Sequence, residues 1–153
     1  MSFDREKLLD DIGKRIAGEL QENARISFAD LGRRVGLTSA GAAERVRKLE
    51  DAGIITGYHA AINTEKLGLP ITAQIGLTAA SNIRHKVKSA VEKMPEVTEC
   101  YHATGSDCFV IRVAVRSISH LEEIINKLNP LGRLNTSIFL SSVLEKRITI
   151  ETD

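Results

Sequence analysis

The amino-acid sequence predicts an α+β protein made of a small helical domain followed by a domain of alternating strands and helices. In the first third of the chain, apolar residues recur every three or four positions, as they do in amphipathic helices. In the second half, short runs with a period of two are separated by two helical runs. A Leu-Gly-Leu-Pro sequence lies between the two patterns and interrupts both. We therefore expect domains at residues 1–63 and 71–153, joined by a linker at 64–70.

The composition is that of an ordinary globular protein, and it argues against several classes of function. Hydrophobic residues make up 42% of the 153 residues, and charged residues make up 27%. There is no Trp, so a stacking platform for single-stranded nucleic acid is not expected. No apolar run is long enough to cross a membrane, and the first residues lack the apolar core of a signal peptide. Two cysteines make no disulfide framework, and we expect a cytoplasmic protein.

A first amphipathic helix is predicted from Asp4 to Leu20. Its apolar residues recur in steps of four, which places them on one face. Gly13 and Gly18 lie inside the helix, and each weakens it by roughly 1 kcal/mol relative to Ala. The helix is therefore expected to depend on packing. Its repeating residues are Leu8, Ile12, Ile16 and Leu20.

The next stretch has the signals of two helices joined by a tight turn. Ser27 and Asp30 form a capping pair that starts a helix, and Gly36 stands where a left-handed residue would end it. Thr38 is a good N-cap for the second helix. This pattern is typical of a helix-turn-helix, here spanning about Phe28 to Arg47.

The second of these helices has a small and basic face opposite its apolar positions. Ala42, Val46 and Leu49 repeat on one side, and the opposite side is small near the helix start and basic after it. A helix-turn-helix places the start of its second helix against base edges in the major groove of DNA. Two packed helices with a solvated charged face remain the alternative. The candidate DNA-binding residues are Arg25, Arg34, Thr38, Ser39, Ala40, Ala43, Glu44, Arg45, Arg47 and Lys48.

Positive charge is concentrated in this region. The whole chain has a net charge of +1, whereas residues 25–48 contain six Arg or Lys residues and two acidic residues, a net of +4. A local positive strip favours salt-dependent contacts with a limited number of phosphates. The charge distribution is therefore compatible with a modest affinity for DNA per subunit.

The residues after the second helix are expected to complete a winged helix-turn-helix. Residues 54–62 resemble a short extended pair around Gly57. This is the place where a winged motif carries its wing. The first domain is therefore predicted to be a winged helix-turn-helix.

The second domain is predicted to have the order strand, helix, strand, strand, helix, strand. Ser81 or Asn82 is expected to cap its first helix, and Ser119 with Glu122 its second, which ends before Pro130. This order is the ferredoxin-like βαββαβ plan. The expected strands are residues 71–79, 97–103, 108–115 and 134–147, and the first helix carries an apolar face from residue 83 to residue 94.

The two middle strands have a predicted register. If Ala103 faces Cys108 in their hairpin, Glu99 lies opposite Arg112 as a pair of opposite charges. The alternation then gives one mostly apolar face to bury. The residues expected on that face are Cys100, His102, Phe109, Ile111 and Val113.

Short motifs in a fixed order cover nearly the whole chain. They are Gln21–Ser27, Leu31–Leu37, Arg45-Val46 with Leu49-Glu50, Gly53–Ile55 with Gly57-Tyr58, Lys66–Gly68, and Glu99-Cys100 followed by Thr104-Gly105 and Asp107. In this order and spacing the chain resembles the leucine-responsive and asparagine-responsive (Lrp/AsnC) transcription regulators of bacteria and archaea. The resemblance implies a DNA-binding regulator whose second domain is the ligand-binding (RAM) domain.

The resemblance also implies how such a protein assembles and responds. In this family the second domain forms a dimer by packing sheet on sheet, dimers assemble to tetramers or octamers, and a small effector, commonly an amino acid, binds between dimers near the Thr-Gly turn. Here one residue separates Gly105 from Asp107, where many members have two, which leaves open whether Asp107 faces an effector or closes the hairpin. The effector-binding candidates are Thr104, Gly105, Ser106 and Asp107.

No catalytic site, metal or cofactor is expected. Cys100, His102 and Cys108 suggest metal ligands by type, but in the predicted register Cys108 projects to the other face, and zinc needs three or four ligands within reach. No Gly-rich phosphate loop or catalytic triad pattern is present. The leading hypothesis is a sequence-specific regulator on double-stranded DNA. An architectural DNA-wrapping protein and an enzyme or carrier built on the second domain are the alternatives.

Overall fold

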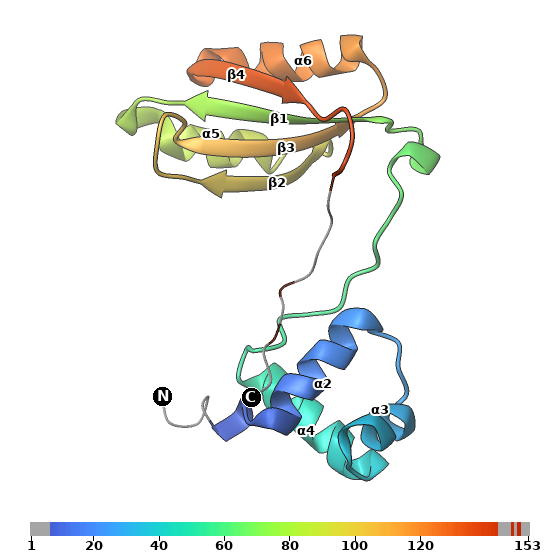
Figure 1. The fold of residues 1–153 in the computed structure, drawn as a ribbon. Helices are drawn as coiled ribbons and strands as arrows, with labels where there is room; N and C mark the ends of the chain where they lie inside the picture. Colours follow the sequence, from blue (N-terminus) through green and yellow to red (C-terminus); the bar gives the residue numbers. More distant parts are fainter. Residues whose placement is uncertain (1–6, 144–147, 149, 151–153) are drawn as a thin grey trace. The chain divides into compact units, whose positions relative to one another are not determined.

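The computed structural model describes residues 7–143, 148 and 150, and it divides the chain into two compact units (Figure 1). The first unit consists of residues 1–61 and 144–153, and the second of residues 62–143. The division after residue 61 falls close to the predicted domain end at residue 63. The sequence analysis assigned residues 144–153 to the second domain, whereas the structure groups them with the first unit.

The first unit begins with α2 (Asp11–Glu22), and its start differs from the prediction. The predicted continuous helix from Asp4 is interrupted at Leu9 and Asp10. The Asp10 carboxylate accepts a hydrogen bond from the Gly13 backbone N–H at 2.8 Å and so caps a new helix. A Cβ on Gly13 would collide with the carbonyl oxygen of Leu8. Gly13 is therefore required by the turn that starts α2.

The two helices of the helix-turn-helix form as predicted. They are α3 (Phe28–Val35) and α4 (Ser39–Asp51). The Ser27 hydroxyl accepts a hydrogen bond from the Asp30 N–H, and Gly36 ends α3 with a φ of 78°. Together with α2 these helices enclose a small core. Its buried residues are Ile16, Leu20, Leu31, Val35, Ala42, Val46 and Leu49.

The segment expected to form a wing has no strands. Residues 56–63 carry no regular secondary structure. The chain first turns back onto α4, because the N–H groups of Ile54 and Ile55 both donate to the Leu49 carbonyl, at 2.9 and 3.1 Å. These hydrogen bonds cap the end of the helix instead of starting a ladder. The extended pair around Gly57 is thus a prediction that the structure does not reproduce.

The second unit has the predicted ferredoxin-like order, and its four-stranded antiparallel sheet is arranged β2-β3-β1-β4 (Figure 1). Helices α5 and α6 share one hydrophobic core with the sheet. The buried residues of both helices contact the same face of the strands. The elements are β1 (Ile71–Thr78), α5 (Arg84–Val91), β2 (Val97–His102), β3 (Phe109–Val115), α6 (Ile118–Leu128) and β4 (Arg133–Ile138), with 3-10 turns at Glu65–Leu67, Ser81–Ile83 and Asn129–Leu131.

The predicted register of the central hairpin is confirmed. Glu99 pairs with Arg112, and the ladder runs to His102 opposite Phe109, with a shift between Val97 and Glu99. The burial expected on β2 is not found, because β2 is an edge strand and its residues 100–102 are exposed. Cys108 also departs from expectation, since it packs against the helix-covered core.

Three element ends in the second unit differ from the prediction. α5 is preceded by a 3-10 turn and starts without a side-chain cap. α6 starts two residues early, because the Ser117 hydroxyl, not Ser119, accepts the N–H of His120 at 3.1 Å. β4 ends at Ile138, and the Phe139 N–H makes one more bond to Thr72. β4 then runs past the start of its partner β1. Residues 144–147 of the predicted strand lie outside the described residues.

Candidate nucleic-acid interface

The start of α4 exposes the face that the sequence predicted. The Thr38 hydroxyl accepts the Gly41 N–H at 3.1 Å and caps the helix. Ser39 and Ala40 are exposed and Ala43 is half-buried. Small side chains at the start of a recognition helix allow its backbone to approach base edges closely. This end of α4 is therefore open to a large, flat or grooved partner.

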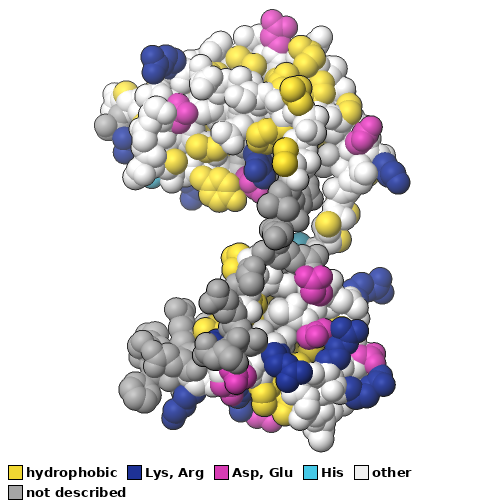
Figure 2. All heavy atoms as spheres, viewed as in Figure 1, with side chains coloured by type: hydrophobic (Ala, Val, Ile, Leu, Met, Phe, Trp, Pro, Cys, Tyr) yellow, Lys and Arg dark blue, Asp and Glu magenta, His cyan; other side chains and the backbone are white. Residues whose placement is uncertain are grey.

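Basic residues follow on the same face. Arg47 and Lys48 are exposed, and Figure 2 shows Lys and Arg side chains on the surface of the first unit. Lys48 Nζ lies 2.8 Å from Glu44 Oε1. The hydrogen bond from Lys48, together with the charges of Lys48 and Arg47, holds the pKa of Glu44 below its usual value. Among the described residues Arg47 has no salt-bridge partner, so its guanidinium is available to a phosphate.

Arg45 is held inside the unit. Its guanidinium pairs with the Asp10 carboxylate, and only 24% of its side chain is exposed. Burial raises the pKa of Asp10, but the hydrogen bond from Gly13 and the contacts with Arg45 outweigh it, so the pKa falls below its usual value. Arg45 thus fastens α4 to the start of α2.

The two flanking arginines differ in how their charge is shared. Arg34 Nη1 lies 2.7 Å from Glu19 Oε2, and both side chains remain partly exposed. Arg15 donates to the backbone carbonyl of Arg34. Arg25 is exposed in the turn between α2 and α3. Both arginines therefore add positive charge at the surface of the helix-turn-helix.

The turn that the sequence assigned to an effector joins β2 to β3. The Ala103 N–H donates to the Cys108 carbonyl at 2.9 Å and closes it. Gly105 has a φ of 125°, a conformation that favours glycine. Thr104, Gly105 and Ser106 are exposed. Their backbone groups are accessible to a polar ligand.

Asp107 turns back over the sheet. A Cβ on Gly76 would stand 2.6 Å from Asp107 Cγ, so the carboxyl group lies directly on the Gly76 backbone. The neighbours of Gly76 in β1 point into the helix-covered core, so Asp107 lies on the opposite face. The Thr78 hydroxyl lies 2.9 Å from the Ser106 carbonyl oxygen and 3.4 Å from Asp107 Oδ1. The carboxylate therefore both closes the turn and remains half-exposed beside it.

The sheet face that carries Asp107 is not covered by either described helix of the second unit. Arg112 Nη1 lies 3.3 Å from Glu99 Oε2, and the guanidinium carbon lies 5.4 Å from the centre of the Phe139 ring. Tyr101 is 58% exposed and Phe139 is 42% exposed. Exposed aromatic rings beside an ion pair on a flat face are typical of a surface that associates with another protein surface.

A buried pair that the sequence analysis missed joins α6 to the residue before β2. His120 Nε2 lies 2.9 Å from Glu96 Oε1, and both side chains are largely buried. The backbone N–H of Glu96 and then His120 hold the pKa of Glu96 below its usual value, although burial opposes this. No local pattern signals a pair that is 24 positions apart. The pair is far from the turn in sequence and packs α6, so we assign it a structural role.

Two searches of the described part of the chain complete the survey. They find no cluster of three or more His, Cys, Asp or Glu residues that could hold a metal ion. They also find no helix with the length and hydropathy needed to span a bilayer.

Comparison with known proteins covers both units. An AsnC-type helix-turn-helix domain profile matches residues 9–50, and an Lrp/AsnC ligand binding domain profile matches residues 72–149. The HTH-type transcriptional regulator LrpC of Bacillus subtilis is 32% identical over 135 residues, 88% of this chain and 94% of that protein. Its solved structure has a TM-score of 0.81 at 31% identity, covering 86% of this chain and 94% of that chain.

A second solved structure carries a ligand. It is a feast or famine regulatory protein from M. tuberculosis complexed with L-methionine, with a TM-score of 0.86 at 29% identity, covering 94% of this chain and 99% of that chain. The matches extend over the helix-turn-helix, the sheet and the turn between β2 and β3. This chain therefore belongs to the Lrp/AsnC family of transcription regulators.

Proposed function

We propose that a dimer of this chain binds specific sequences in double-stranded DNA by placing α4 of each protomer in the major groove. The observation that carries this proposal is the exposed face of α4, which is small at Ser39, Ala40 and Ala43 and basic at Arg47 and Lys48. Two-fold helix-turn-helix proteins read half-sites about 34 Å apart, or a multiple of it, along one side of the duplex. The operator should therefore contain two related half-sites at that spacing.

The other candidates divide by their contacts. Arg25 and Arg34 are exposed, and we assign them to phosphates on either side of the groove. Glu44 restrains Lys48 through their ion pair and lies where it could accept a hydrogen bond from cytosine. Arg45 positions α4 through Asp10 and does not itself reach for DNA.

The proposal is tested with the double variant Arg47→Ala and Lys48→Ala, and with Lys86→Ala and Lys88→Ala as the control. Both pairs remove two exposed positive charges, but the control pair lies on α5 of the second unit. Each lost phosphate contact should lower the slope of log affinity against log salt by roughly 1. Gel-shift titrations at several salt concentrations measure this. Equal affinity and slope for the two double variants would contradict the proposal.

An amino acid is the proposed effector, and residues 104–107 its site. The relative solved with L-methionine supports the class of ligand. The turn offers the chemistry such a ligand needs, because backbone amides around Gly105 can receive a carboxylate and the half-exposed Asp107 carboxylate can receive an ammonium group. Effector and DNA must then alter each other's affinity by the same factor.

Titration calorimetry with L-methionine and L-leucine tests the effector site. Asp107→Asn keeps the shape of the side chain but removes its charge, so amino acid affinity should fall about tenfold or more. Glu122→Gln, an exposed acid on α6, is the matched control and should bind normally. Unchanged affinity in Asp107→Asn would remove Asp107 from the site.

We further propose that the uncovered sheet face forms the dimer and that dimers assemble to tetramers or octamers. The exposed aromatic residues Tyr101 and Phe139 support this assignment. Tyr101→Asp should shift the sedimentation coefficient towards that of a monomer, because it places a charge in a face that would be buried. A variant that keeps the wild-type assembly would exclude this face.

Two other functions are separated from the leading one by simple observations. An architectural protein that wraps DNA would protect long tracts with little sequence preference, whereas a regulator protects short discrete sites. An enzyme or carrier built on the second unit would not need the basic face of α4. We therefore propose a regulator without catalytic activity, working in the cytoplasm where the genome lies.

A further inference from the structure

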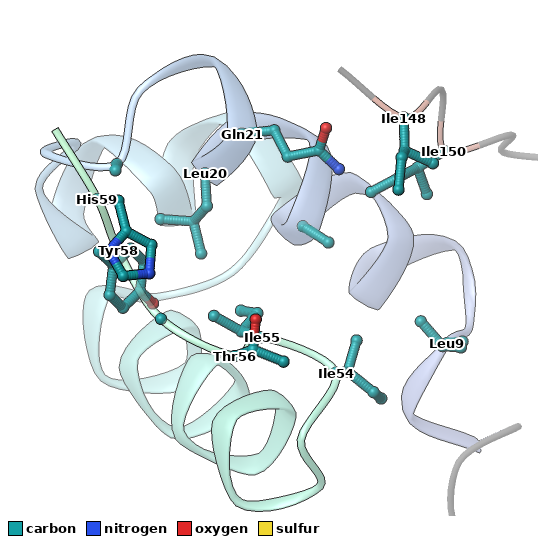
Figure 3. Close-up of a pocket in the computed structure, with 13 residues that line it drawn as sticks. Leu9, Leu20, Gln21, Ile54, Ile55, Thr56, Tyr58, His59, Ile148 and Ile150 are labelled. Carbon is teal, nitrogen blue, oxygen red and sulfur yellow. The ribbon is translucent and has the colours of Figure 1, made fainter. Parts of the chain in front are cut away.

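An apolar groove crosses the first unit on the side of α2 (Figure 3). It has a volume of about 750 Å³. Leu20 and Gln21 of α2 line it, as do Ile54 and Ile55 at the end of α4 and Tyr58 beyond them. The groove belongs neither to the exposed face of α4 nor to the turn at residues 104–107. Its function is therefore separate from DNA contact and effector binding.

The occupant of the groove comes from the same chain. Ile148 and Ile150 line it, and the structure groups residues 144–153 with this unit. Figure 3 shows the two isoleucines beside α2 at one end of the groove, with Tyr58 and His59 at the other end. Ile150 is half-buried, whereas Ile148 is 84% exposed. Ile150 is thus the deeper of the two contacts.

The sequence around these residues suits such a contact. Residues 147–151 read Arg-Ile-Thr-Ile-Glu, so polar and apolar residues alternate. In an extended segment this alternation places both isoleucines on one face and the polar residues on the other. An apolar face of two isoleucines is complementary to a groove whose walls are mostly Leu and Ile.

We propose that Ile148 and Ile150 anchor the segment 144–153 in this groove as an intramolecular strap. The chain leaves the first unit through residues 62–70 and returns to it after residue 143, so the strap connects the two units a second time. A contact between parts of one chain benefits from a high effective concentration. Even the partial burial of Ile150 can therefore keep the strap bound for most of the time.

Cross-linking tests which chain supplies the strap. Gln21→Cys and Ile148→Cys, in a background with Cys100→Ser and Cys108→Ser, place two thiols at the groove and keep Ile150 in place. A short bismaleimide should join them within one chain, which gives a faster band on a denaturing gel. The control pair replaces Gln21 by Arg33→Cys, an exposed position on α3 outside the groove, and should react far less.

A second experiment measures the contact without cross-linking. Ile150→Asp should lower the hydrogen-exchange protection of the amides of Ile54 and Ile55 about tenfold, the size expected for losing a partly buried isoleucine. Val143→Asp is the control, because Val143 is 96% exposed and does not line the groove. Both experiments are made without DNA, so their outcome is independent of the proposed function.

Two results would overturn the proposal. A covalent dimer in the cross-linking experiment would show that a second copy of the chain supplies the segment. Equal cross-linking in the groove and control pairs, with unchanged protection in Ile150→Asp, would show that the groove is open to another partner.

Discussion

Replacing Gly76 by Ala tests the position of the Asp107 carboxyl group on the sheet. The new Cβ would stand 2.6 Å from Asp107 Cγ, whereas carbon atoms normally approach to about 3.5–4.0 Å. Asp107 must therefore move by about 1 Å and leave its place beside Thr78. The atom in the way belongs to a side chain, so we expect a displaced carboxylate and an intact sheet.

The expected stability change follows from two opposing effects. Overpacking of this kind typically destabilises by roughly 1–3 kcal/mol, whereas Ala in place of Gly in a strand stabilises by roughly 0.5–1 kcal/mol. Gly76→Ala alone should therefore lower the free energy of unfolding by about 1 kcal/mol. In an Asp107→Ala background the clash is gone, and the same change should raise it by about 0.5–1 kcal/mol. The coupling free energy is then about 2 kcal/mol.

Urea unfolding of the four proteins of this cycle, at one fixed protomer concentration, measures the coupling. Gly105→Ala is the matched control. Its Cβ would meet no atom within 4 Å, but its φ of 125° strains any other residue, so Asp107→Ala should not relieve its cost of roughly 1–3 kcal/mol. A coupling between Gly76 and Asp107 below about 0.5 kcal/mol would refute the reasoning, because independent sites add within that range.

Three further predictions concern the two units separately. Gly132→Ala should destabilise the second unit by about 2–4 kcal/mol in urea unfolding, because its Cβ would collide with the backbone carbonyl of Thr78 and its φ is 153°. The lowered pKa of Glu96 contributes stability above the ordinary pKa of a glutamate, which is lost as the pH falls through the lowered value. Glu96→Gln should therefore flatten the acid limb of stability against pH, and an unchanged limb would contradict this. Burial and the hydrogen bond to Glu50 raise the pKa of Tyr58 to about 12, so Glu50→Gln should lower the pKa in a spectroscopic titration that follows tyrosinate absorbance.

Local features of the fold could be predicted from the sequence, because the interactions that determine them join residues close together in the chain. The caps at Ser27 and Thr38 each bond an N–H three residues away, and Gly36 supplies the conformation that ends α3. The register of the central hairpin follows from the short turn between Ala103 and Cys108. Failures of the same kind were also local. Two serines compete to start α6, and no propensity decides between them.

The sequence by itself therefore determined the two domain types, the family and the exposed face of α4, since period, caps and motif spacing specify these. Only the tertiary structure decided where Asp107 and Arg45 point. The first lies on Gly76 and the second meets Asp10, each 31 or more positions away in the sequence. The groove that meets Ile150 also joins distant segments. Such contacts depend on how whole elements pack, and the residues that make them carry no local signal of their partners.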